Sequence, residues 1–141
     1  MTGWQDMKLL DRTQHSQSLA QKRILIVDDS ADIRDSLAEL LRLENYDVTT
    51  ASEGQAALDY LRAANINPDL IILDLLMHGM SGYEFLSQKK LIPEISGTKV
   101  IIMTANQLED AKNLGTEGFL RKPIAVDDLL KLISDLLGSS R

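Results

Sequence analysis

The stretch Leu70-Ile71-Ile72-Leu73-Asp74-Leu75-Leu76-Met77 decides the fold, because it is a short apolar strand with a single acid inside it. Continuous apolar runs of this kind, in contrast to alternating ones, are typical of strands buried on both faces of a parallel sheet. The runs Ile24 to Val27 and Val100 to Met103 have the same character. The chain therefore contains several strands that need a covering layer on each side.

Outward from this stretch, strand-like and helix-like segments alternate along the chain. In the first pair, the strand Ile24 to Val27 is followed by a helix that Ser30 caps and whose apolar residues Ile33, Leu37, Leu40 and Leu41 lie on one face. The other four pairs, each a strand and then a helix, are Asp47 to Ala51 with Glu53 to Ala64, Leu70 to Asp74 with Gly82 to Lys90, Lys99 to Thr104 with a short helix near Leu108 to Asn113, and Gly118 to Arg121 with Val126 to Leu137. Because parallel neighbours need crossover connections, this alternation predicts an α/β fold in which five helices cover both faces of a five-stranded sheet.

A length of 141 residues fits one domain. Residues 1 to 22 show no sustained hydrophobic period, so we expect a flexible N-terminal extension; a short docking helix built on Trp4, Met7 and Leu10 is the alternative. The folded domain is expected over residues 23 to 138, and residues 139 to 141 form a C-terminal tail.

The net charge, the cysteine content and the length of the apolar runs indicate the kind of partner and the cellular location to expect. A formal net charge of −6 opposes binding to phosphate backbones, so we expect protein partners and no DNA binding by this domain. The chain has no cysteine, which suits a reducing compartment. Its apolar runs are too short to cross a bilayer, and its start lacks the apolar segment of a signal peptide. A cytoplasmic location without membrane attachment is the resulting expectation.

Polar residues stand where the predicted strands end. Asp28 and Asp29 follow the first strand, Asp74 ends the third, Thr104 ends the fourth, and Lys122 follows the fifth. In an open parallel sheet these ends meet at one ligand-binding edge. Three carboxylates gathered there repel one another unless a cation lies between them, and oxygen ligands favour Mg²⁺. With a lysine and a hydroxyl nearby, the set can support phosphoryl transfer to an aspartate.

Taken singly, these residues have structural explanations as well. Asp28 and Asp29 precede a helix whose positive end favours acids. Thr104 and Lys122 are of types that usually lie at the surface. Asp74 is harder to explain structurally, because an acid between apolar neighbours is costly to bury without a partner.

Five motifs in order make the chain resemble a response-regulator receiver domain from Arg23 to Leu137. They are Ile24-Leu25-Ile26-Val27-Asp28-Asp29, Leu70 to Met77, Gly79-Met80-Ser81-Gly82, Met103-Thr104-Ala105 and Gly118-Phe119-Leu120-Arg121-Lys122-Pro123. The resemblance implies a flavodoxin-like, doubly wound sheet with strand order 2-1-3-4-5.

The resemblance also implies a role for each site residue. Asp74 would accept a phosphoryl group from a phosphohistidine on a sensor histidine kinase or a histidine phosphotransfer protein, and the domain would then act on a downstream protein. It would catalyse only its own phosphorylation and dephosphorylation, so it would not be an enzyme in the usual sense. The remaining roles would be Mg²⁺ binding by Asp28, Asp29, Asp74 and the Leu76 carbonyl, phosphoryl binding by Thr104, Ala105 and Lys122, a switch formed by Thr104 and Phe119, and a cis peptide bond between Lys122 and Pro123.

Two departures from the family pattern concern the site and its output. His78 stands where relatives commonly have proline, so the loop beside Asp74 loses a φ restraint; a solvated side chain and a general base are the two interpretations of this histidine. The interval from Thr104 to Phe119 is short, which compresses the fourth helix and points to an unconventional output face.

Three other functions compete with the receiver interpretation. A Mg²⁺-dependent phosphatase with an aspartyl-phosphate intermediate needs a second acid two residues after the nucleophile, where this chain has Leu76. A flavin-binding module needs a phosphate-binding loop after the first strand, where two acids stand instead. A receiver-like interaction module that works without phosphorylation remains the alternative.

Overall fold

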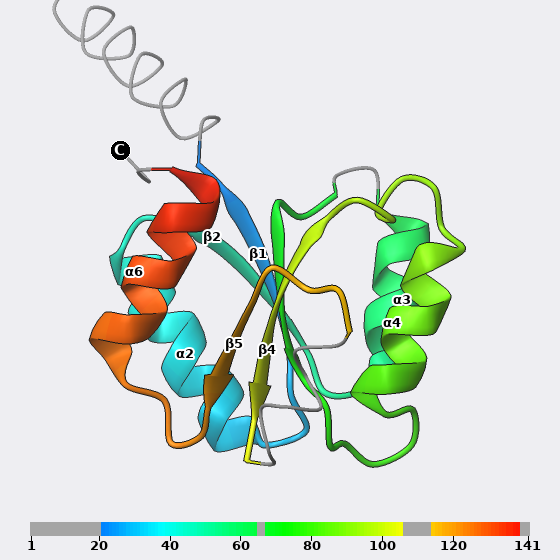
Figure 1. Cartoon of the computed structure of the whole chain (residues 1–141), viewed down its shortest axis with the longest axis horizontal. Coiled ribbons are helices and arrows are strands. Elements are labelled where there is room, and N and C mark those ends of the chain that lie inside the picture. Colours follow the sequence, from blue (N-terminus) through cyan, green and yellow to red (C-terminus); the bar gives the residue numbers. More distant parts are fainter. Residues whose placement is uncertain (1–20, 65–66, 106–113, 139–141) are drawn as a thin grey trace, which may run out of the picture.

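The protein is described from a computed structural model, which covers residues 21–64, 67–105 and 114–138. One sheet of five parallel strands runs through it in the order β2-β1-β3-β4-β5 (Figure 1). The strands are β1 (Arg23–Val27), β2 (Asp47–Ala51), β3 (Leu70–Asp74), β4 (Lys99–Thr104) and β5 (Gly118–Arg121). The predicted parallel sheet and its strand order are confirmed.

Helices cover the sheet on both faces. In the described part of the chain they are α2 (Ala31–Leu43), α3 (Gly54–Ala63), α4 (Gly82–Lys90) and α6 (Val126–Leu137). Figure 1 shows α2 and α6 on one side of the sheet and α3 and α4 on the other. Five helices were expected and the described residues contain four, because the predicted helix near Leu108 to Asn113 lies outside them.

The core explains why the strands are continuously apolar. Ile24 and Ile26 of β1 pack into the cluster with α2 and α6, whereas Leu25 and Val27 pack into the cluster with α3 and α4. Successive side chains of a strand point to opposite faces, so a strand with helices on both sides buries every residue. Each fully buried side chain of this kind contributes roughly 1.5 to 3 kcal/mol to folding.

Local capping fixes where two of the helices begin. The Ser30 hydroxyl accepts a hydrogen bond of 3.3 Å from the Ile33 amide, at the start of α2. At α4, Ser81 and Glu84 form a capping box in which each side chain accepts a 3.2 Å bond from the other's amide. Helix α2 therefore starts at Ala31, soon after β1 ends at Val27, whereas residues 75–81 separate the end of β3 from α4.

The predicted N-terminal extension and C-terminal tail lie mostly outside the described residues. Of the predicted extension, residues 21 and 22 are described, and the Gln21 side chain donates 3.0 Å bonds to the carbonyl and side-chain oxygens of Asn45. The predicted tail, residues 139 to 141, lies outside the described residues. Among the helices that are described, none combines the length and the apolar character needed to cross a membrane.

Candidate functional site

The carboxyl edge of the sheet gathers three acids. Asp28 follows β1 and Asp74 ends β3, the strand beside β1 in the sheet. Asp28, Asp29 and Asp74 each offer a carboxylate oxygen, and these three oxygens lie within 4.8 Å of one another. Asp28 is 0% exposed and Asp74 is 5% exposed. The sequence prediction that these distant acids converge is therefore correct.

Lys122 lies between the two buried acids. Its Nζ donates to Asp28 Oδ2 at 2.8 Å and to Asp74 Oδ2 at 3.1 Å. Three carboxylates and one ammonium give the cluster a formal charge of −2. The Lys122 amide also donates to the Thr104 carbonyl at 2.8 Å, and the peptide bond between Lys122 and Pro123 is cis. One cation thus serves two buried anions, and the cluster is short of positive charge.

The second oxygen of each buried acid is bound by the backbone of its own loop. Asp28 Oδ1 accepts from the Ser30 amide at 2.8 Å, and Asp74 Oδ1 accepts from the Leu76 amide at 3.2 Å. Arg34 donates to the Asp28 carbonyl at 2.8 Å, which ties the loop to α2. Both carboxylates are held in fixed orientations by these bonds.

The ionisation of Asp74 and Lys122 follows from burial and from their contact. Burial raises the pKa of Asp74, and the hydrogen bond and positive charge of Lys122 reduce that rise without cancelling it. Burial alone would lower the pKa of Lys122, but its two acidic partners raise that pKa above its ordinary value. Lys122 therefore keeps its charge, and Asp74 is an acid whose charge this site supports poorly.

Asp29 has a separate partner. Its Oδ2 accepts a 3.1 Å bond from the His78 amide and lies 2.8 Å from His78 Nδ1. Burial raises the pKa of Asp29, but the bonds and charge from His78 outweigh that effect and lower it overall. The His78 side chain is fully exposed, so it is solvated as expected, yet it also contacts a predicted metal ligand. No pattern in the sequence predicts this contact, which joins residues 49 positions apart on two loops.

The family model of the response regulator receiver domain matches residues 24–134. The chain belongs to this family. It is 35% identical over 123 residues to Sporulation initiation phosphotransferase F of Bacillus subtilis (strain 168), covering 84% of this chain and 96% of that protein. Two-component response regulator ORR6 of Oryza sativa subsp. japonica is 33% identical over 123 residues, which cover 84% of this chain and 72% of the relative.

Solved structures of the same family share the fold. The response regulator protein TrrA from Thermotoga maritima, in complex with Mg²⁺-BeF, has a TM-score of 0.72 and 33% identity, covering 83% of this chain and all of that one. A CheY-like receiver domain protein from Methanospirillum hungatei JF-1 has a TM-score of 0.74 and 34% identity, covering 85% of this chain and 96% of that one. The flavodoxin-like fold implied by the resemblance is confirmed.

Three other predicted site residues, Thr104, Ala105 and Leu76, lie at the same edge of the sheet, where β4 and β3 end. Thr104 is fully buried at the end of β4, and Ala105 follows it at an exposed position. Leu76 follows Asp74 on the same loop with a half-exposed side chain. Phe119 lies one strand further out on β5, opposite Ile102, and packs against the α3 and α4 side of the core. It is the one predicted residue that belongs to the core rather than to the cluster edge.

Gly82, which the sequence marks only as part of a motif, helps to shape the site. A Cβ at this position would lie 2.5 Å from the Asp74 carbonyl oxygen and 2.7 Å from the Leu75 Cα. The Gly82 amide donates to the Leu75 carbonyl at 2.9 Å. The absence of a side chain therefore lets α4 start against the backbone that carries Asp74.

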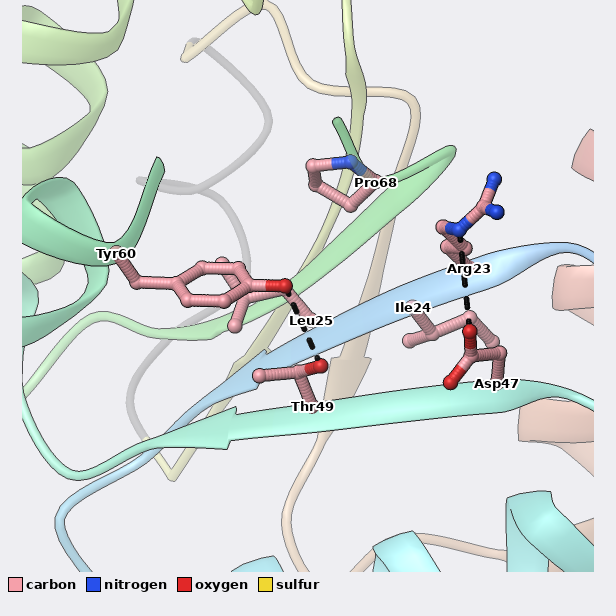
Figure 2. Close-up of a pocket in the computed structure, with 7 residues that line it drawn as sticks. All are labelled: Arg23, Ile24, Leu25, Asp47, Thr49, Tyr60 and Pro68. Carbon is pink, nitrogen blue, oxygen red and sulfur yellow. Dashed lines mark hydrogen bonds and ion pairs between the residues drawn. The ribbon is translucent and has the colours of Figure 1, made fainter. Parts of the chain in front are cut away.

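A separate cavity of about 110 Å³ lies at the opposite end of the strands (Figure 2). An ion pair of 3.8 Å between Arg23 and Asp47 and a 3.5 Å contact between Thr49 and Tyr60 are the polar features of its wall. Because Arg23 and Asp47 begin β1 and β2, this cavity is at the amino edge of the sheet. It shares no residue with the acidic cluster.

Proposed function

We propose that this receiver domain accepts a phosphoryl group on Asp74 from a phosphohistidine donor and then switches its contacts with other proteins. One observation carries the proposal. Asp74 is a buried carboxylate 3.1 Å from a lysine ammonium and beside two further acids, at the edge of the sheet where ligands bind. A purely structural acid would not need a second buried acid competing for the same cation.

The acidic cluster fits a divalent cation. With a formal charge of −2, carboxylate oxygens within 4.8 Å of one another repel strongly, and a hard ion such as Mg²⁺ prefers such ligands. Asp28, Asp29 and Asp74, with the Leu76 carbonyl, would hold it. The TrrA structure, solved in complex with Mg²⁺-BeF, supports this assignment for the family. When bound, the metal supplies positive charge between the carboxylates and an incoming phosphoryl oxygen.

The transfer itself is a substitution at phosphorus. A carboxylate oxygen of Asp74 forms a bond to phosphorus while the bond from phosphorus to the donor imidazole nitrogen breaks, and the imidazole leaves with a proton from solvent. The product is a mixed anhydride on Asp74. Lys122 would pair with one phosphoryl oxygen, while the Thr104 hydroxyl and the Ala105 amide would bind others. Attack of water on phosphorus then restores Asp74 and releases inorganic phosphate.

The proposed readout is a rearrangement that involves Thr104 and Phe119. Thr104 lies beside the cluster, and Phe119 packs behind it on the next strand. Engagement of the Thr104 hydroxyl by a phosphoryl group would change the space available to the ring. The proposed partners are a sensor histidine kinase or a histidine phosphotransfer protein and a downstream protein target. The name of the Bacillus relative, a phosphotransferase, favours a relay role.

Mass spectrometry tests the proposal directly. The protein is incubated with a small acyl phosphate or phosphoramidate and Mg²⁺, and the intact mass is followed with time. We expect a gain of one phosphoryl group that hydroxylamine removes, as an acyl phosphate requires. Asp74→Asn should gain none, whereas Asp59→Asn, which changes an exposed acid on α3, should behave as the unmodified chain.

Two results would overturn the proposal. Either the unmodified chain gains no phosphoryl group, or Asp74→Asn gains as much as the unmodified chain does. The first result would leave a receiver-like interaction module that works without phosphorylation. The second would place the modification on another residue.

A further inference from the structure

A second small cavity lies at the amino edge of the sheet, on the side that α4 covers. Its volume is about 110 Å³, and it shares no residue with the cavity of Figure 2 or with the acidic cluster. The last turns of α4, the residues that lead into β4 and the residues that lead into β5 form its described walls. The proposed phosphoryl site lies at the other end of the strands, so phosphoryl chemistry does not explain this cavity.

Lys89 brings a buried positive charge to the cavity wall. The residue is 6% exposed, although a lysine is almost never buried without a partner. Its Nζ donates one hydrogen bond, of 3.0 Å, to the Ser96 carbonyl. An ammonium group carries three donors, so two of them have no acceptor among the described residues.

No acid in the described part of the chain forms an ion pair with Lys89. Glu117 is near enough to favour the charged lysine, but its carboxylate already accepts a 2.7 Å bond from the Val100 amide. Burial lowers the pKa of Lys89, Lys90 adds to that effect, and Glu117 opposes it without restoring the ordinary value. The fold therefore supports the charge of Lys89 poorly.

A hydroxyl without a partner lines the same cavity. The Oγ1 atom of Thr116 is buried, and no group in the described ranges forms a hydrogen bond with it. Buried polar atoms of this kind are rare in proteins, and a bound water, ion or other ligand is a common explanation. The groups that line the cavity therefore include three unused donors, two on Lys89 and one on Thr116.

The volume and the charge of the cavity limit the class of ligand. A water molecule needs roughly 10 to 15 Å³ of such space, so about 110 Å³ holds several waters or one molecule of a few non-hydrogen atoms. Two lysines, Lys89 and Lys90, and one glutamate, Glu117, give the walls a formal charge of +1. One monovalent anion neutralises that charge, whereas Glu117 repels a divalent anion such as phosphate more strongly. A carboxylate also offers the acceptors that the unused donors lack.

We propose that this cavity binds a small monocarboxylate, about the size of acetate, whose oxygens accept hydrogen bonds from Lys89 and Thr116. Binding neutralises the buried ammonium and gives the Thr116 hydroxyl a partner. Because Lys89 belongs to α4 and Thr116 precedes β5, the bound carboxylate also ties that helix to that strand. The acidic cluster takes no part in this site, so the proposal does not rest on the phosphorylation of Asp74.

An NMR titration of the isotope-labelled full chain tests the proposal, with acetate as the probe. We expect saturable shifts of amide signals from the cavity walls, such as those of Gly97 and Gly115, with a dissociation constant of roughly 0.1 to 10 mM. Sodium chloride at the same ionic strength should not produce these shifts. The amide signals of Asp28 and Asp29, at the other edge of the sheet, should not move.

Three variants identify the groups that bind. Lys89→Met removes the ammonium and keeps an unbranched side chain, so it should weaken acetate binding by more than about 10-fold while the domain stays folded. Thr116→Val keeps the shape of the side chain without the hydroxyl and should weaken binding about 10-fold. Lys131→Met is the matched control, because it removes a lysine of α6 whose side chain is 77% exposed, and it should bind acetate as the unmodified chain does.

Four results overturn the proposal. Acetate produces no saturable shifts at the cavity walls, chloride produces the same shifts, or Lys89→Met and Thr116→Val both bind acetate as tightly as the unmodified chain. In these three cases Lys89 is a structural lysine that ties Ser96 to α4, and the cavity holds only water. The fourth result comes from a parallel titration with phosphate, because tighter binding of phosphate than of acetate contradicts the choice of a monocarboxylate.

Discussion

Replacing Asp74 by asparagine should stabilise the domain when no divalent metal is present. The substitution keeps the shape of the side chain and keeps an oxygen for the 3.2 Å bond from the Leu76 amide. It removes one negative charge from a cluster whose formal charge is −2. Lys122 does not lose its partner, because it retains the 2.8 Å bond to Asp28. The variant therefore relieves repulsion without leaving a buried cation unpaired.

The magnitude follows from the geometry of the cluster. With an effective dielectric constant of about 20, the attraction between Asp74 and Lys122 at 3.1 Å is worth about 5 kcal/mol. Repulsion from Asp28 at up to 4.8 Å offsets about 3.5 kcal/mol of it, and Asp29, which is partly exposed, offsets somewhat less. The attraction and the repulsions nearly cancel, so the free-energy cost of removing the Asp74 carboxylate, which is 5% exposed, from water remains. We expect Asp74→Asn to raise the free energy of unfolding by about 1 to 3 kcal/mol.

The difference in the free energy of unfolding between Asp74→Asn and the unmodified chain should depend on pH. Because the pKa of Asp74 is raised in the folded state, the folded state binds this proton more tightly than the unfolded state does. The stability that this proton contributes is present below the unfolded value, 3.8, and is lost as the pH rises through the folded value. The free energy of unfolding of Asp74→Asn should therefore exceed that of the unmodified chain most at neutral pH, and this difference should shrink as the pH falls.

Equilibrium unfolding in urea measures this effect, with a chelator in one series and Mg²⁺ in another. Mg²⁺ should stabilise the unmodified chain more than Asp74→Asn, because the variant has lost one carboxylate ligand. Asp59→Asn controls for the loss of an acid elsewhere. The reasoning is refuted if Asp74→Asn is the less stable protein without metal, or if Mg²⁺ stabilises both proteins equally.

Three further substitutions test single features of the site. Lys122→Gln leaves two buried carboxylates without a cation, so the free energy of unfolding should fall by about 3 to 5 kcal/mol without metal; a loss below 1 kcal/mol in urea unfolding would contradict the shared ion pair. Gly82→Ala should lower the free energy of unfolding by about 1 to 3 kcal/mol, because its Cβ would lie 2.5 Å from the Asp74 carbonyl oxygen. Gly97→Ala is the control and should leave this free energy almost unchanged, because a Cβ there meets nothing within 4 Å. His78→Ala removes the ring contact to Asp29 and should weaken Mg²⁺ binding about 10-fold in a calorimetric titration; equal or tighter binding would show that His78 does not orient that ligand.

The fold was predictable because its determinants are local in the sequence. The segment 70 to 74 was recognisable as a buried strand from its apolar residues alone, and β3 has these bounds. Helix α4 begins and ends where the sequence predicted, since Ser81 provides the cap and the last turn carries lysines. Residues 53 to 64 were predicted as a helix; α3 runs from Gly54 to Ala63, and the two flanking residues are its caps. Differences of one residue at helix ends are normal.

The site was predictable as a set of residues but not as a set of contacts. The topology of a parallel sheet brings the ends of its strands together, so the meeting of Asp28, Asp74 and Lys122 follows from chain order. That Lys122 bonds both acids, and that His78 bonds Asp29, depends on side-chain orientation across 48 to 94 residues of sequence. Hydrophobic periodicity carries no information about such bonds, and neither does the identity of the residue types.

Lys122 connects the acidic cluster to the surface beside it. It holds two anions in the absence of a phosphoryl group, and a phosphoryl group on Asp74 would add negative charge that competes with Asp28 for the same ammonium. The Lys122 amide donates a hydrogen bond to the Thr104 carbonyl. Lys122 also lines the groove between α2 and the loop before α6. A displacement of Lys122 therefore changes the groove wall. If a partner protein contacts that wall, linkage requires that phosphorylation of Asp74 alter the affinity for the partner by the same factor as the partner alters the phosphorylation equilibrium.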